Sequence, residues 1–131
     1  MRARRRALLA LLAVLGLAVP APAQPPASLK ILIPADPGGS WDQMARAMEQ
    51  ALRTEKLVAG PIRLTNHGGG DGTVGLARFA RAKGEAGSLM VMGQTMIAAI
   101  VTGGSPRTLA SVTPIARLTS EPAVIVVPAS S

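Results

Sequence analysis

The stretch LKILIPADPGGS, residues 29–40, decides the fold predicted for this chain. Its first five residues form an apolar run that holds one lysine and stops at a proline, which is typical of a mostly buried strand. A proline and two glycines at residues 37–39 then predict a turn. Ser40 is a good helix N-cap, and Gln43 stands three positions later, at the spacing of a capping box. The stretch therefore predicts a strand, a turn and a helix in succession.

The rest of the chain continues this alternation. The first helix is expected to run to Lys56, because its apolar residues recur at three- and four-residue steps. Four more apolar runs are predicted to be strands: Ile62–Thr65, Leu89–Met92, Ile115–Leu118 and Ala123–Val127. Two more helices are predicted, Thr73–Ala82 and one from Gln94 or Thr95 toward Val101. Strands that alternate with helices indicate an α/β fold with a largely parallel sheet flanked by helices.

The first 23 residues have the layout of a cleavable signal peptide. Four arginines within the first six residues precede an uncharged apolar run of 13 residues, Ala7–Val19. Ala21-Pro22-Ala23 supplies the small-x-small site, which places the cleavage between Ala23 and Gln24. The apolar run is shorter than the roughly 20 residues that a membrane-spanning helix needs. We therefore expect an exported protein, with the Sec route as the default and the Tat route left open.

Composition excludes several classes of function. The net charge of +7 falls to +3 without the leader, because four of the 14 basic residues lie in it and all seven acidic residues lie after it. The remaining cations are scattered, and Trp41 and Phe79 are the only aromatic residues, so no platform for stacking nucleic-acid bases is expected. The chain has no cysteine, so its core must be stable without disulfides.

Three loops are expected to meet at one edge of the sheet. Parallel strands place their strand-to-helix loops at the carboxyl edge, where ligands of such folds bind. These loops are Ala35–Ser40, Asn66–Gly72 and Gly93–Thr95. Two of them are glycine-rich, and each leads into a helix N-terminus whose free amides favour an anion. The loops therefore predict an anion-binding cleft, with glycines that serve only tight turns as the alternative.

Enzymatic interpretations of these loops are weaker. GDGTVG, residues 70–75, matches the GxGxxG pattern of dinucleotide-binding loops, but residues 90–94 lack the acid expected near the end of the next strand. Ser40 lacks the GxSxG frame of a hydrolase and is interpreted as a helix cap. His67 and the three aspartates nearby match no metal-binding loop, so neither metal nor cofactor is expected. Trp41 is assigned to the apolar helix face, with a place in the cleft as the alternative.

Three motifs point to a known family. They are IPADPGGSWD at residues 33–42, NHGGGDGTVGL at residues 66–76, and TPIARL at residues 113–118 leading to VIVVP at residues 124–128. Their order and spacing resemble those of the Bug-type periplasmic receptors, the substrate-binding proteins of tripartite tricarboxylate transporters. Trp41-Asp42-Gln43 looks closest to the tricarboxylate-receptor branch of that family.

The resemblance implies a two-lobed periplasmic-binding-protein fold, type II-like and closing like a flytrap. Residues 24–118 would form an incomplete first lobe, and residues 119–131 would begin the crossover to a second lobe that this sequence lacks. Such a protein is a monomeric receptor and not an enzyme; it binds a small organic acid and delivers it to the membrane subunits of a transporter. The implied first-lobe ligand residues are Ala35, Asp36, Pro37, Gly38, Gly39, Ser40, Trp41, Asp42, Gly69, Gly70, Asp71, Gly72, Thr73, Gln94 and Thr95.

Two acidic residues depart from the family pattern. Asp36 stands where a small or apolar residue is usual, and Asp71 replaces a glycine of the second motif. Both would repel a carboxylate, so a ligand with an amino or amide group, or with fewer carboxylates, is one hypothesis. Two other functions stay open, a dinucleotide-dependent exported enzyme that uses Gly70, Gly72 and Gly75, and a binding module that signals to a sensor kinase.

Overall fold

The computed structural model describes residues 26–103, 105, 107–120, 122 and 124–130, so the predicted leader and its cleavage site at Ala23 and Gln24 lie outside the described residues. The elements follow one another along the chain as β1 (Leu29–Ile33), α2 (Ser40–Thr54), β2 (Ile62–Asn66), η1 (Gly70–Gly72), α3 (Thr73–Phe79), β3 (Ser88–Met90), α4 (Gln94–Val101) and η2 (Leu109–Ser111). In this part of the chain, no helix has the length and apolar character needed to cross a membrane.

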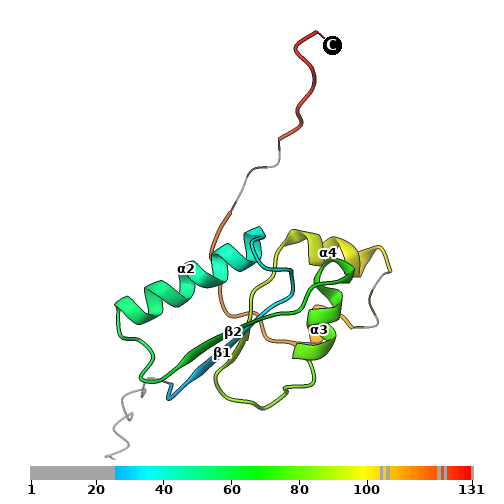
Figure 1. Cartoon of the computed structure of the whole chain (residues 1–131). Coiled ribbons are helices and arrows are strands. Elements are labelled where there is room, and N and C mark those ends of the chain that lie inside the picture. Colours follow the sequence, from blue (N-terminus) through cyan, green and yellow to red (C-terminus); the bar gives the residue numbers. More distant parts are fainter. Residues whose placement is uncertain (1–25, 104, 106, 121, 123, 131) are drawn as a thin grey trace, which may run out of the picture.

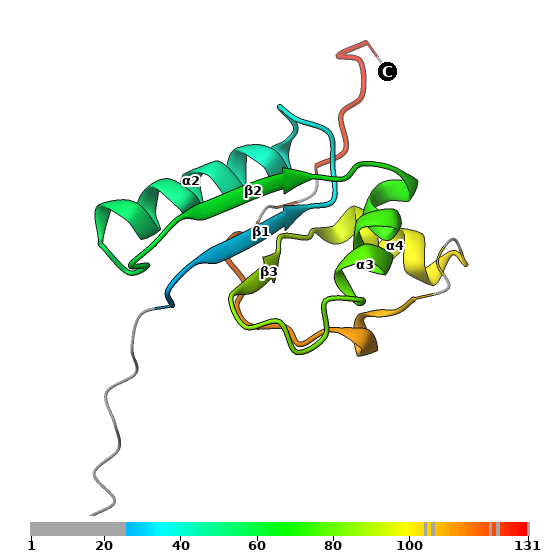
Figure 2. The same ribbon diagram turned by 60° about the horizontal axis from the view of Figure 1, so that its bottom comes forward.

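The three strands form one parallel sheet in the order β2-β1-β3 (Figure 2). The central strand β1 pairs with β2 from Leu29 opposite Ile62 to Ile33 opposite Asn66, and with β3 through Lys30–Leu32. Its buried and less buried positions alternate, as expected for a strand with helices packed around it. The predicted α/β class, with a parallel sheet flanked by helices, is confirmed.

Helices cover the sheet from two sides. The helix α2 packs on β1 and β2, whereas α3 packs on β1 and α4, and Figures 1 and 2 show α2 and α3 on opposite sides of the strands. Six buried apolar residues form the main core between the sheet and α2: Leu29, Ile31, Ile33, Ala45, Ile62 and Val91. Two further apolar side chains, Leu76 of α3 and Met96 of α4, are fully buried.

The prediction of strands at Ile115–Leu118 and Ala123–Val127 was wrong. Residues 115–118 and 124–127 have no strand structure, and Ala123 lies outside the described residues. Their apolar side chains are exposed, Ile125 by 95%, and residues 124–130 lead away from the sheet (Figure 1). A run of β-branched residues becomes a strand only when it pairs with a neighbour and packs against it, and the described residues provide neither.

The predicted cap of the first helix was also wrong. Gly39 is the N-cap, and no side chain caps the helix there. Two other side chains reach back to the preceding loop instead: the Asp42 carboxylate accepts a hydrogen bond from the Gly38 amide at 2.9 Å, and the Gln43 amide donates to the Gly38 carbonyl at 3.0 Å. Both bonds tie the loop to the first turn of α2, and Ser40 stands exposed in that turn.

The core makes a direct prediction about stability. Ile33 is fully buried at the end of β1, whereas Ile97 of α4 is 43% exposed. Ile33→Ala should lower the free energy of unfolding by about 2–5 kcal/mol, because it removes buried methyl groups and leaves a void. Ile97→Ala is the matched control and should cost under about 1 kcal/mol. Urea denaturation of both variants checks this, and equal losses would contradict the assignment of the core.

Candidate functional site

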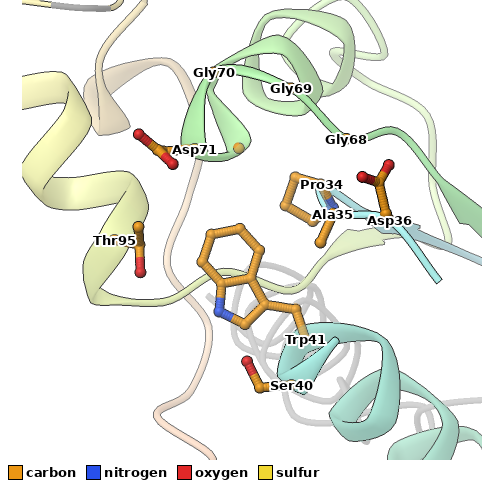
Figure 3. A pocket seen from close by; sticks show the side chains of 11 residues that line it. Pro34, Ala35, Asp36, Ser40, Trp41, Gly68, Gly69, Gly70, Asp71 and Thr95 are labelled. Atoms are coloured by element: carbon orange, nitrogen blue, oxygen red, sulfur yellow. The ribbon is translucent and has the colours of Figure 1, made fainter. Parts of the chain in front are cut away.

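A cavity of about 380 Å³ lies at the carboxyl edge of the sheet (Figure 3). The chain passes from β1 to β2 on one side and then crosses to β3 on the other. At such a reversal the loops after the strands diverge and leave a crevice, which is where α/β folds bind ligands. The residues that line the cavity are Pro34, Ala35, Asp36, Ser40, Trp41, Gly68, Gly69, Gly70, Asp71, Gly72 and Thr95.

The three predicted loops meet at this cavity, although they do not contribute all of their predicted residues. Sequence reasoning missed Pro34 and Gly68, which line the cavity. Pro34 directly follows the first strand, and Gly68 lies two residues after the end of the second. Their positions after the strands could therefore have indicated that they line the cavity. The predicted residues that do not line it are Pro37, Gly38, Gly39, Asp42, Thr73 and Gln94.

Asp42 has a different place from the predicted one. Its side chain is almost fully buried and its oxygens are taken up by protein donors. Arg46 donates to it through Nε at 2.8 Å and through a terminal nitrogen at 3.1 Å. The Gly38 amide and the Asn66 side-chain amide complete the set, the latter at 3.0 Å. Asp42 therefore holds the loops together and is not available to a ligand.

Asn66 extends this network to the first loop. The same amide nitrogen that reaches Asp42 also donates to the Ala35 carbonyl at 3.1 Å. Asn66 is the last residue of β2, so its side chain ties the end of that strand to the segment after β1. Sequence reasoning placed Asn66 in the second motif but gave it no role.

These donors have an electrostatic consequence. Hydrogen bonds from Arg46, Gly38 and Asn66 to the ionised carboxylate hold the pKa of Asp42 well below its usual range, against the opposing effect of burial. The Asp42 carboxylate in turn raises the pKa of Arg46. Asp42 therefore remains charged in the folded chain even in mild acid.

The glycine loop forms a left-handed turn beside the cavity. Four successive residues have positive φ, namely Gly69 at 111°, Gly70 at 54°, Asp71 at 52° and Gly72 at 92°. The Gly72 amide closes the turn on the Gly69 carbonyl at 3.1 Å, and the Thr73 hydroxyl donates to the Gly70 carbonyl at 2.7 Å. The amides of Gly68 and Gly69 find no acceptor within the described residues, so they are free to meet a ligand.

Trp41 takes both of the positions considered for it, on the apolar helix face and in the cavity. Its half-buried indole packs against the main core and also lines the cavity. Figure 3 shows the ring between Ser40 and the glycine turn. Two glycines make room for it: a Cβ on Gly72 would lie 2.7 Å from the ring, and one on Gly93 would lie 2.5 Å from its nitrogen. The indole can occupy this position because residues 72 and 93 have no side chain.

Two helix N-termini reach the cavity. The N-caps of α2 and α4 are Gly39 and Gly93, and neither helix has a side-chain cap. The first-turn amides of a helix have no partner in the helix itself and carry partial positive charge. Ser40 and Thr95, from the first turns of these helices, line the cavity, and neither hydroxyl makes a hydrogen bond within the described residues.

Charge in the cavity wall is acidic. Asp36 and Asp71 are the charged side chains that line it in the described part of the chain. Between residues 26 and 130, in so far as these are described, no three His, Asp or Glu residues gather as metal ligands. Donors for an anion are consequently main-chain amides, hydroxyls and the indole N–H of Trp41, with no arginine or lysine among the described lining residues.

A second, smaller hollow of about 150 Å³ lies at the amino edge of the sheet. Lys30 and Arg63 line it together with Ser28, Leu29 and Pro61. Lys30 forms an ion pair with Glu85 at 3.1 Å, and both side chains are largely exposed. This hollow has basic groups but neither a glycine turn nor a helix N-terminus among its lining residues.

Comparison with known proteins adds no relative. No protein-family model, no curated protein and no solved structure matches the chain. The resemblance to Bug-type receptors therefore stays a prediction, and function has to be inferred from the cavity.

The packing of Trp41 can be tested with a pair of glycines. Gly72 and Gly84 both have positive φ, at 92° and 86°, but a Cβ on Gly84 would meet nothing within 4 Å. Gly84→Ala should cost about 1 kcal/mol of backbone strain and leave the fluorescence of Trp41, the single tryptophan, unchanged. Gly72→Ala should cost more and shift the emission, because the ring must move. Identical spectra for the two variants would contradict this account.

The Asp42 network predicts a dependence of stability on pH. Because folding lowers the pKa of Asp42, its contribution to stability is complete above its unfolded pKa of about 3.9 and is lost as the pH falls below that value. Asp42→Asn should therefore be less stable at neutral pH and should lose less stability than the native chain between about pH 4 and pH 2. Urea titrations at several pH values measure this.

The control for the lost charge is Glu55→Gln. Glu55 is exposed just after α2, and its side chain makes no hydrogen bond within the described residues. The free energy of unfolding of Glu55→Gln should fall with decreasing pH as that of the native chain does. An Asp42→Asn variant as acid-sensitive as the native chain would show that the carboxylate does not hold the loops.

Proposed function

We propose that this chain belongs to a periplasmic solute-binding receptor that captures a small carboxylate for a tripartite tricarboxylate transporter. The observation that carries the proposal is the cavity at the carboxyl edge, where the first turns of α2 and α4 and the glycine turn meet. Helix N-termini and glycine-rich turns are the parts of a protein that bind anions through the main chain.

The available donors suit a carboxylate. The hydroxyls of Ser40 and Thr95 flank the cavity, and the unpartnered amides of Gly68 and Gly69 belong to its wall. Neutral donors of this kind hold a carboxylate without the desolvation cost of burying a cationic side chain. The binding-protein interpretation is also consistent with the site's chemistry, because the cavity wall has neither a histidine nor a serine beside a base.

In the proposed receptor, this part of the chain is the first lobe. By the resemblance, residues 119–131 would begin the crossover to a second lobe, which would close over the cavity when a ligand is bound. Ligand favours the closed state because it contacts both lobes only there. The closed receptor then passes its ligand to the membrane subunits. The proposed flytrap fold and the periplasmic location rest on the sequence motifs and on the leader.

A dinucleotide enzyme is less well supported. The GxGxxG segment follows the edge strand β2, and the strand after it, β3, pairs with β1. The helix after the segment, α3, has seven residues, and residues 90–94 at the end of β3 contain no acid to bind a ribose. Gly75 does lie close against Pro34, as the third glycine of such a motif would, but this packing serves any α/β fold.

Ligand-induced stabilisation tests the proposed function. Citrate and succinate, each at about ten times its Kd, should stabilise the full chain by about 1.4 kcal/mol and raise Tm by several degrees. NAD should have no effect. The double variant Ser40→Ala/Thr95→Ala should lose most of the response, and Thr102→Ala, which lies outside the cavity, should keep it. Stabilisation by NAD alone would contradict the proposal and favour the enzyme.

A further inference from the structure

We infer that the amino edge of the sheet is a docking surface for a bilayer that carries anionic phospholipids. This surface lies at the end of the fold opposite the cavity, so it goes beyond the proposed function and does not depend on what the cavity binds. Three features support it: the cations that the topology gathers at this edge, the acidic charge at the other edge, and an exposed leucine among the cations.

Cations that are scattered in the sequence meet at the amino edge because the strands are parallel. Each helix returns the chain to the edge where the strands begin, so the connections from α2 to β2 and from α3 to β3 both lie there (Figure 2). The start of β1 joins them, since Lys30 pairs with Glu85 of the second connection and shares the small hollow with Arg63 of β2. The exposed cations of this edge are Lys30, Arg53, Lys56, Arg63, Arg81 and Lys83.

Most of this positive charge is not neutralised. Lys30 is paired with Glu85 at 3.1 Å, and Arg53 is paired with Glu49 at 2.8 Å. The other four cations form no ion pair within the described residues. Glu55, next to Lys56 in the sequence, adds one further acid to the edge. The edge therefore presents an excess of positive charge to the solvent.

The opposite edge carries the opposite charge. Asp36 and Asp71 line the cavity at the carboxyl edge, and the nearby charge of Arg46 is balanced by its ion pair with Asp42. The two ends of the sheet therefore differ in sign, and the field of an anionic surface attracts one end and repels the other. This field turns the amino edge toward the bilayer and leaves the mouth of the cavity facing the solvent.

Leu57 favours a bilayer over other polyanions. It is 55% exposed, and it directly follows Lys56 in the connection between α2 and β2. At a membrane surface, cations meet the lipid phosphates while an apolar side chain enters the boundary between headgroups and acyl chains. Both kinds of residue therefore contribute to binding. A nucleic acid would instead call for aromatic side chains that stack on bases, and residues 53–63 and 80–88 contain none.

Vesicle sedimentation tests this docking surface. The experiment uses the chain from Gln24 on, the form expected after cleavage, because the leader has arginines and an apolar run of its own that would bind lipid. This chain should bind vesicles of mixed phosphatidylglycerol and phosphatidylcholine, and it should not bind vesicles of phosphatidylcholine alone. Salt at about 0.5 M should release it, because the charges are then screened.

Variants of exposed residues locate the surface. Lys56→Gln and Arg63→Gln should each weaken binding to the anionic vesicles about fivefold, and the double variant about 25-fold. Leu57→Ser should weaken it at least about twofold without a change in charge. Ala47→Glu is the matched control, because it lowers the net charge by one as each cation variant does. Ala47 is exposed in the middle of α2, about 10 Å before the end of the helix, and binding should change less than about twofold.

The inference is overturned if the chain does not bind the anionic vesicles, or if it binds phosphatidylcholine alone equally well. Equal losses in Ala47→Glu and in the two cation variants also overturn it, since net charge and not the edge would then determine binding. If poly-glutamate binds the chain at a salt concentration where the vesicles do not, the partner of the edge is an acidic protein and the inference is wrong. Each of these results leaves the proposed carboxylate receptor intact.

Discussion

The candidate site depends on the buried carboxylate of Asp42. One charge accepts hydrogen bonds from the loop after β1, from the second turn of α2 and from the end of β2. A buried charge is costly unless donors surround it, so these three segments are stable together or not at all. The loop between β1 and α2 is rich in proline and glycine and has little packing of its own. Asp42 ties this loop to α2 and to the end of β2.

The cavity wall combines rigid and permissive parts. The N-termini of α2 and α4 come from elements that are anchored in the core by Ala45 and Met96. The turn from Gly69 to Gly72 has positive φ throughout, a conformation that glycine adopts without strain. Glycines at positions 72 and 93 let the indole fit between these parts. Main-chain donors therefore surround a space whose charged side chains are both acidic.

Local signals predicted most of the elements, and pairing decided the rest. The first strand could be predicted because its apolar run and its terminal proline are both local features, and the prediction that α/β loops converge follows from a parallel sheet. The apolar run at residues 124–127 has the same local pattern but no partner strand among the described residues, and sequence alone does not show a partner. Ser40 was predicted as a cap from its residue type and from the capping-box spacing to Gln43. In the structure, Asp42 and Gln43 bond to Gly38 instead, and the choice between these arrangements depends on side-chain geometry. The links made by Asn66 join residues 24 and 31 positions apart, which no local pattern encodes.

The central claim is that main-chain amides at the carboxyl edge of the sheet bind a small acid. The most direct measurement is a two-dimensional ¹H–¹⁵N NMR titration of the labelled chain with succinate. We predict that the amide shifts change most at residues 38–42, 68–72 and 93–96, because these segments border the cavity. Shift changes confined to residues 28–30 and 62–63, around the basic hollow at the amino edge, would contradict the account. The acid would then bind to the lysine and arginine side chains of that hollow and not to the amides of the loops.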